Sequence, residues 1–170
     1  MNKINYLKKK NSFLLKKKNI FIFCIVLIIF TIDRVTKILI KNNLDEISFY
    51  VNDFINLDLI WNTGIGFGLL NTDSLLLYNF TTIIIGAVII FLLYLAIISK
   101  NLDKLIFAII IGGAFGNFYD RIFFNAVPDF IDLHYNNFHW FTFNAADIFI
   151  TIGILFYLIK DFLIRKNNNE

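Results

Sequence analysis

Four long apolar stretches, separated by shorter polar segments, dominate the pattern of the chain. The plainest of them, residues 74–99, contains no charged residue. About 20 apolar residues are enough for a helix to cross a bilayer, so each stretch predicts one membrane-spanning helix. The predicted spans are residues 19–40, 75–98, 105–123 and 145–164.

Between the first two spans the pattern changes from continuous to alternating. In residues 47–61 most apolar side chains fall on odd positions, Phe49 and Leu57 among them, and polar ones fall on even positions. A period of two residues is typical of a β-strand. Asn52 and Asp53 interrupt this segment as a turn, which predicts two short strands in a small sheet at the membrane surface.

The composition favours a membrane protein. The 170 residues are 58% hydrophobic and 18% aromatic, with a mean hydropathy of +0.67, which is far from the average of soluble domains. The first apolar run resembles a secretory signal, but it is long and no small-residue cleavage site follows, so we interpret it as a retained anchor. The single cysteine, Cys24, lies within this run and cannot form a disulfide inside the chain.

Basic residues gather at one end of the predicted spans. They occur in residues 1–18, at Lys100 and Lys104, and at Lys160, Arg165 and Lys166. Segments rich in Lys and Arg stay in the cytoplasm, so both termini are predicted to be cytoplasmic. We therefore divide the chain into a basic cytoplasmic extension (1–18), a four-helix membrane domain (19–166) and a cytoplasmic tail (167–170). The extension is either a solvated tail attracted to lipid or a short basic helix on anionic headgroups.

This orientation brings polar residues that are far apart in the sequence to the outer side of the membrane. They are Asp33, Asn62, Asp120, Asp129 and Asp147. Ionisable residues at membrane spans are costly, so their convergence predicts a functional site. The predicted fold is an all-α membrane protein of four transmembrane helices, with a small β cradle on the outer membrane face.

Asp129 and Asp147 are the candidates for chemistry. Two carboxylates that share one proton can divide general base and general acid work on a water molecule, as in an aspartic peptidase. Spacing alone leaves open the alternative of ordinary interfacial carboxylates that face water. Asp33 and Lys37 are four residues apart on one helical face, so a local ion pair and a supporting role at the site are both open.

Five short blocks carry a resemblance to one family. They are DRVTK (33–37), NTGIGFG (62–68), GGAFGNFYDR (112–121), VPDF (127–130) and FNAAD (143–147). In residues and in order they resemble the signature blocks of lipoprotein signal peptidase, also called signal peptidase II. The resemblance extends over residues 33–153, from the first predicted span to the last.

Members of this family are bacterial inner-membrane aspartic endopeptidases. They remove the signal peptide of prolipoproteins by cutting just before a diacylglyceryl-modified cysteine. The resemblance implies that residues 19–166 are a membrane peptidase domain and that Asp129 and Asp147 are the catalytic aspartates. It also implies two supporting sets: Asn62, Gly64, Asn117, Arg121 and Asn144 line or brace the substrate site, and Asp33, Lys37 and Asp120 serve stability or full activity.

Three residues depart from the family pattern. Arg34 stands where Gln is usual, Ile65 stands where a small residue is usual, and Pro128 takes a place often filled by Val. None of them removes a carboxylate, so the departures concern substrate fit more than the reaction.

Several of these residues also have a simpler interpretation. Asn117 and Asn144 are as well suited to capping helix ends as to contacting substrate. Arg121 has the alternatives of pairing with Asp120 or extending to lipid headgroups. The aromatic residues near the outer face fit an interfacial belt; they are Trp61, Tyr135, Phe138 and Trp140.

No metal or organic cofactor is expected. His134 and His139 are five residues apart, which is not the spacing of the helical zinc motif H-E-x-x-H, so a metallopeptidase is disfavoured. The expected partners are a prolipoprotein with a diacylglyceryl cysteine and membrane lipids, without nucleic acid, and we expect a monomer. The alternative function is a small proton- or ion-coupled transporter, whose carboxylates would be distributed through the thickness of the membrane.

Overall fold

The structure is a computed structural model that describes residues 17–43, 48–64 and 74–169. Most of the basic extension, residues 65–68 of the NTGIGFG block and the last residue lie outside the described residues. The interpretations that concern these segments, Ile65 among them, therefore stay predictions.

Helices make up most of the described chain, and each predicted span lies within one of them. The helices are α2 (Lys17–Asn43), α3 (Leu75–Ile98), α4 (Asn101–Phe124) and α5 (Ala145–Asn169). The bounds of α3 match the prediction, whereas the other three helices are longer. Hydropathy marks where an apolar run ends, but Lys and Arg are good helix formers and continue the helix beyond it.

Helix α4 lies at the centre, in contact with α2, α3 and α5. Its apolar side chains Ile106, Phe107, Ile110 and Ile111 form a buried cluster with Ala96 of α3. Its glycines let the neighbouring helices approach closely: a Cβ added at Gly112 would lie 2.8 Å from Cβ of Ile29 in α2. Small residues at helix contacts are typical of packing in membranes, where side chains gain little from leaving lipid.

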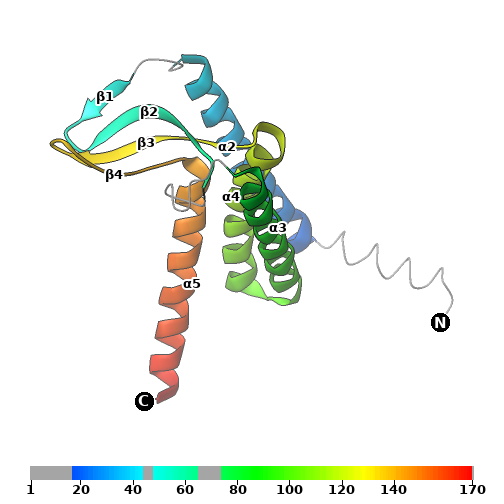
Figure 1. Cartoon of the computed structure of the whole chain (residues 1–170). Helices are drawn as coiled ribbons and strands as arrows, with labels where there is room; N and C mark the ends of the chain where they lie inside the picture. Colours follow the sequence, from blue (N-terminus) through cyan, green and yellow to red (C-terminus); the bar gives the residue numbers. More distant parts are fainter. Residues whose placement is uncertain (1–16, 44–47, 65–73, 170) are drawn as a thin grey trace.

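A four-stranded antiparallel sheet lies at one end of the helices (Figure 1). Its strands follow chain order: β1 (Phe49–Asn52), β2 (Ile55–Asn62), β3 (Val127–Tyr135) and β4 (Phe138–Phe143). The sequence predicted the first two strands and the turn between them, where Oδ1 of Asn52 accepts hydrogen bonds from the backbone N–H groups of Phe54 and Ile55.

The sequence predicted two strands, whereas the sheet has four, because β3 and β4 were not identified. Strand β3 is buried along most of its length, and its buried positions include Pro128, Asp129, Asp132 and His134. Polar residues at buried positions remove the alternation by which a strand is identified. The description as all-α is therefore corrected to a mostly helical fold with a four-stranded sheet.

The opposite end of the helices gathers basic residues. Nζ of Lys104, near the start of α4, donates a hydrogen bond of 2.7 Å to Asn19 at the start of α2. Lys160 of α5 forms an ion pair with Asp103 of α4. The sheet and this basic end thus lie at opposite ends of the helices, as the charge pattern predicted.

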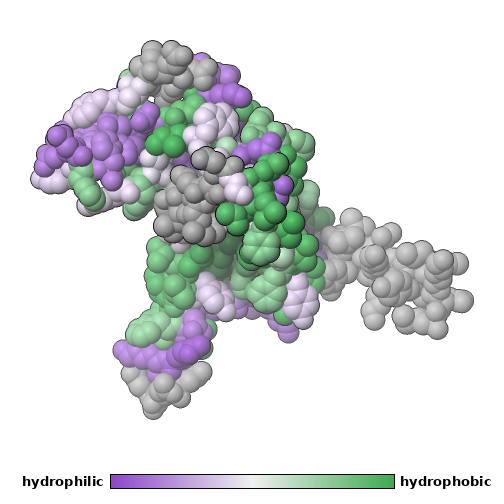
Figure 2. Space-filling view, viewed as in Figure 1, coloured by the Kyte–Doolittle hydropathy of each residue, from purple (hydrophilic) through white to green (hydrophobic). Residues whose placement is uncertain are grey.

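The helices expose apolar side chains over most of their surface (Figure 2). Among the described residues, two helices are long and apolar enough to cross a membrane, Leu75–Ile98 and Asn101–Phe124. This is fewer than the four predicted spans. Helices α2 and α5 carry charged residues within their apolar runs, among them Asp33 and Asp147, and these belong to the site described next.

Candidate active site

The two candidate aspartates reach one place from different elements. Asp129 lies on β3 and is 2% exposed, and Asp147 lies in the first turn of α5 and is 8% exposed. Asn144 joins them: its Nδ2 donates to Oδ1 of Asp129 at 2.5 Å, and its backbone N–H donates to Oδ2 of Asp147 at 3.1 Å. Both carboxylates are thus buried and share one hydrogen-bonding partner.

The start of α5 explains why Asp147 points toward Asn144. Oδ1 of Asn144 accepts the backbone N–H of Asp147 at 3.2 Å, while Asp147 accepts the backbone N–H of Asn144. This reciprocal pair is a capping box, which satisfies N–H groups left free at a helix N-terminus. Asn144 therefore caps the helix with its Oδ1 and also binds Asp129 with its Nδ2, while its contact with substrate stays a prediction.

Asn62, the last residue of β2, holds the other oxygen of Asp129. Its Nδ2 donates to Oδ2 of Asp129 at 2.8 Å, and its Oδ1 accepts the backbone N–H of Gly64 at 2.7 Å. Antiparallel pairing of β2 with β3 brings these segments together, with Asn62 opposite Val127. The adjacent sheet thereby orients one of the two carboxylates.

Asn117 does not cap a helix, because it lies in the interior of α4. Its Nδ2 donates to Oδ1 of Asp147 at 2.8 Å, and its Oδ1 accepts a hydrogen bond of 2.8 Å from Nζ of Lys37. It therefore connects Asp147 to a cluster of charged residues on α2 and α4.

That cluster contains Asp33, Arg34, Lys37 and Asp120. Arg34 donates to both oxygens of Asp120, at 2.5 and 2.6 Å, and Lys37 lies 2.9 Å from Asp33 and 2.7 Å from Asp120. The local Asp33–Lys37 pair is real but belongs to this larger network. Buried charges are tolerated when they are paired and hydrogen-bonded, as Asp33, Lys37 and Asp120 are here, and the partly buried Arg34 pairs with both carboxylates.

The network also supports the helix that carries Asp147. Oδ1 of Asp33 accepts the backbone N–H of Ala146 at 3.1 Å, so a carboxylate of α2 stabilises the N-terminus of α5. Sequence reasoning missed the contribution of Arg34. The available signal was a third charged residue beside Asp33 in an apolar run.

Arg121 follows neither of its simpler interpretations. It is 4% exposed, donates a hydrogen bond to the carbonyl oxygen of Gly64, and lies with its guanidinium 5.6 Å from the ring centre of Tyr78. In the described part of the chain, its Nη1 is buried without a hydrogen-bond partner. Arg121 thus braces the segment after β2 and retains one donor atom inside the protein.

Burial raises the pKa of Asp129 to about 7, and the nearby charge of Asp147 adds to the increase. Hydrogen bonds from Asn62 and Asn144, and the charge of Lys37, act in the opposite direction. A carboxyl group with this pKa holds a proton for a large part of the time near neutral pH, so the pair can offer one acid and one base together.

Two buried aspartates that share a partner, one on a strand and one on a helix, in a protein whose helices have an apolar surface, define the class of membrane aspartic peptidases. A family model described as Signal peptidase (SPase) II matches residues 25–163. The chain therefore belongs to the signal peptidase II family, and it is an enzyme of the aspartic peptidase type.

Relatives and solved structures agree with this assignment. The chain is 47% identical to the lipoprotein signal peptidase of Pelagibacter ubique (strain HTCC1062), over 100% of this chain and 99% of that protein. It is 34% identical to the lipoprotein signal peptidase of Francisella tularensis subsp. mediasiatica (strain FSC147), over 86% and 94%. A solved structure described as a bacterial membrane enzyme superposes with a TM-score of 0.74 at 30% identity, covering 88% of this chain and 90% of that one. This protein is therefore a membrane protein, and the transporter alternative gains no support.

Proposed function

We propose that the protein removes signal peptides from prolipoproteins that carry a diacylglyceryl group, cutting just before the modified cysteine. The name of the Pelagibacter relative, which is similar along the whole chain, supports this substrate class. The observation that carries the proposal is the pair of buried aspartates, Asp129 and Asp147, joined through Asn144.

We propose that Asp147 is the general base and Asp129 the general acid. Asp147 lies in the first turn of α5, where the helix dipole favours negative charge, and it accepts hydrogen bonds from Asn117 and from the backbone of Asn144. Asp129 has its pKa raised to about 7 by burial and by Asp147, which favours a proton at that position.

In the proposed reaction, a water oxygen attacks the scissile carbonyl carbon while Asp147 takes a proton from the water and Asp129 gives its proton to the carbonyl oxygen. Asp147 then passes its proton to the peptide nitrogen as the carbon–nitrogen bond breaks. Asp129 recovers a proton from a hydroxyl of the intermediate, so the enzyme returns to its starting state.

A groove beside the pair suits the substrate. Its volume is about 240 Å³, and it is lined by Phe141, Phe143, Asp147, Ile148, Thr151 and Ile152. Only two of these side chains are polar, so a lipid-modified peptide can lie against the groove with little loss of hydration. We propose that the substrate enters it from the lipid, with its signal helix beside α5 and its acyl chains left in the bilayer.

We propose that all four helices span the membrane, with both termini cytoplasmic and the sheet and aspartates on the outer face. The separation of the sheet from the basic end near Lys104 and Lys160 supports this orientation. Every residue in the proposed reaction belongs to one chain, so we propose that a monomer is sufficient.

The test is cleavage of a purified prolipoprotein that carries the diacylglyceryl group. Asp129→Asn and Asp147→Asn should each lower the rate by about 10² to 10⁴, the contribution of a general acid or base, while substrate binding remains. The control is Asp161→Asn, a partly exposed carboxylate that pairs with Arg165 on the surface of α5 and should keep the parental rate.

Variants are compared only where their melting temperatures in detergent match that of the parent. Full activity of either catalytic-site variant would refute the assignment of the pair. Failure of the folded parent to cut the lipid-modified protein would refute the substrate class.

A further inference from the structure

A second group of polar residues lies on the hairpin of β3 and β4, outside the aspartate pair. Asp132 and His134 are two residues apart on β3, so their side chains leave the same face of the strand. His139 on β4 stands directly opposite His134 in the strand pairing. The hairpin thus brings together a carboxylate and two imidazoles. The spacing of five residues between His134 and His139 did not predict that they would be neighbours.

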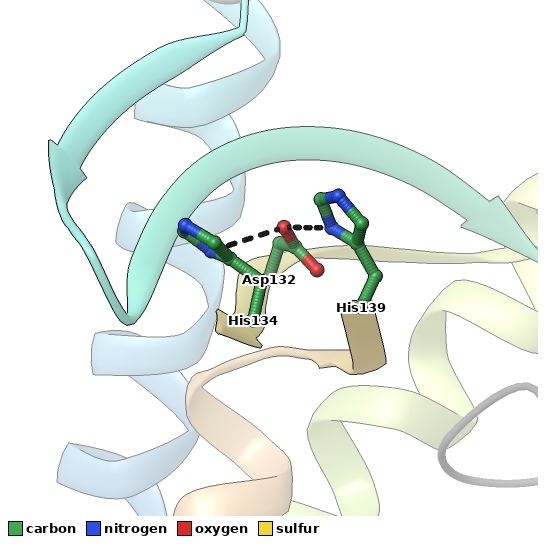
Figure 3. Close-up of side chains that lie close together, drawn as sticks. All are labelled: Asp132, His134 and His139. Atoms are coloured by element: carbon green, nitrogen blue, oxygen red, sulfur yellow. Dashed lines mark hydrogen bonds and ion pairs between the residues drawn. The ribbon is translucent and has the colours of Figure 1, made fainter. Parts of the chain in front are cut away.

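The three side chains converge on one point (Figure 3). The carboxylate of Asp132 lies between the two rings, with its Oδ2 2.7 Å from Nδ1 of His139 and 3.5 Å from Nδ1 of His134. One candidate ligand atom from each residue lies within 4.8 Å of the other two. Neighbouring ligands of a tetrahedral zinc ion, with bonds of about 2 Å, are separated by about 3.3 Å, so this spacing needs only small adjustment.

The hydrogen bonds of the hairpin leave this group incomplete. His134 is 6% exposed, and its buried Nδ1 has no hydrogen-bond partner among the described residues. Asn56 of β2 is paired with Asp132 from the other side, so its side chain leaves the same face of the sheet, and its buried Oδ1 also has no partner in the described ranges. A buried polar atom without a hydrogen bond is destabilising, so two of them beside one carboxylate indicate a place for a ligand.

We propose that Asp132, His134 and His139 bind a Zn²⁺ ion, with Oδ1 of Asn56 or a water molecule completing four ligands. Imidazole nitrogens and a carboxylate oxygen are ordinary zinc ligands, and two buried ligands with one exposed histidine leave a way in from solvent. The ion would satisfy the His134 nitrogen, which the Asp132–His139 hydrogen bond alone does not.

The proposed ion has a structural role, distinct from peptide cleavage. Side chains alternate along β3, so Asp129 leaves the face opposite to Asp132 and His134. Bound zinc would join β3 to β4, the two strands that lead to Asp129 and to Asn144. Zinc binding at this hairpin therefore depends neither on the substrate nor on the catalytic roles of the two aspartates.

The test uses the full-length protein in detergent, without a histidine tag and freed of metal with EDTA. Titration with ZnCl₂ by calorimetry should give one ion for each chain, and elemental analysis after gel filtration should find the same ratio. Co²⁺ in place of Zn²⁺ should give the intense visible absorption of a tetrahedral site, which a merely structural hydrogen bond cannot produce.

Each ligand substitution should weaken zinc binding at least tenfold: Asp132→Asn, His134→Ala and His139→Ala. Loss of a partner that only orients a ligand already costs about tenfold in metal affinity, and loss of a ligand should cost more. His139→Ala is the safest of them for folding, because this side chain is 59% exposed. Asp129→Asn and Asp147→Asn are the matched controls and should bind zinc like the parent. No stoichiometric zinc on the folded parent, or equal binding by His139→Ala, would overturn the proposal, as would loss of binding in the two controls only.

Discussion

Asn62, Asn117 and Asn144 each donate a hydrogen bond to Asp129 or Asp147 and accept another with the amide oxygen. A side-chain amide can do both because it carries a donor and an acceptor. Asn117 also stands between Lys37 and Asp147, so a neutral group separates the cation from the carboxylate. A direct ion pair would stabilise the ionised form strongly, whereas this arrangement keeps a proton available to the pair.

The pH dependence of cleavage follows from Asp129. Its pKa is raised to about 7, so the proton it donates is present below that pH and is lost as the pH rises through it. We expect kcat/KM to fall on the alkaline side of about pH 7. Asn62→Ala removes a donor that stabilises the ionised form, so the pKa should rise and the alkaline limb should move to higher pH.

Rates measured between pH 5 and 9 decide this prediction. Asn137→Ala, in the exposed turn between β3 and β4, is the matched control and should leave the limb in place. An alkaline limb that stays fixed in Asn62→Ala, or moves to lower pH, would show that Asp129 does not supply the proton.

At the level of elements, α4 has glycines where it meets α2 and α5. The absence of side chains at these positions lets the helices approach closely enough for the charged network to form. A Cβ at Gly116 would overlap the carboxylate of Asp33, and one at Gly113 would overlap the backbone of Ala146. The glycines of the GGAFGNFYDR block are therefore required by close approach of helices. Their spacing in the sequence is explained by packing, and the polar residues that follow them, Asn117, Asp120 and Arg121, belong to the site.

Gly116→Ala should destabilise the protein although alanine is the better helix former. Displacing Asp33 breaks a buried ion pair, which costs about 3 to 5 kcal/mol, against a gain of about 1 kcal/mol in helix propensity. Gly86→Ala in α3 is the matched control, because its Cβ would meet only the ring of Phe118, at 3.2 Å. Thermal unfolding in detergent should show a clearly lower melting temperature for Gly116→Ala. Equal melting temperatures would mean that Asp33 can move without loss.

The elements differed in how well the sequence predicted them. The unbroken run of α3 fixed its bounds, and the alternation from Phe49 onward predicted β1 and β2. Strand β3 was not predicted because it buries charged and polar residues. Hydrogen-bonding partners stabilise these residues in the fold, but hydrophobic periodicity does not reveal them. His134 and His139 became neighbours only through the register of a strand pair that had not been predicted.

At the scale of the whole molecule, apolar runs and basic ends were enough to predict which polar residues converge. Asp33, Asn62, Asp120, Asp129 and Asp147 do lie together, linked by hydrogen bonds and ion pairs. Which atom bonds to which could not be predicted, because it depends on helix rotation and strand register. The insertion of Arg34 between two carboxylates is of this kind, since either face of α2 was open to it.

The proposed orientation of the whole molecule predicts which surfaces meet the outside of the cell. In a Cys24→Ser background, Asn137→Cys places a thiol in the exposed β3–β4 turn, and Arg165→Cys places one at the exposed far end of α5. A membrane-impermeant maleimide added to intact spheroplasts should label Asn137→Cys and should label Arg165→Cys only after lysis, because basic helix ends stay cytoplasmic. Retained prolipoprotein cleavage by both variants is the control for folding. Labelling of Arg165→Cys before lysis would contradict the proposed orientation and would indicate that the aspartate pair faces the cytoplasm.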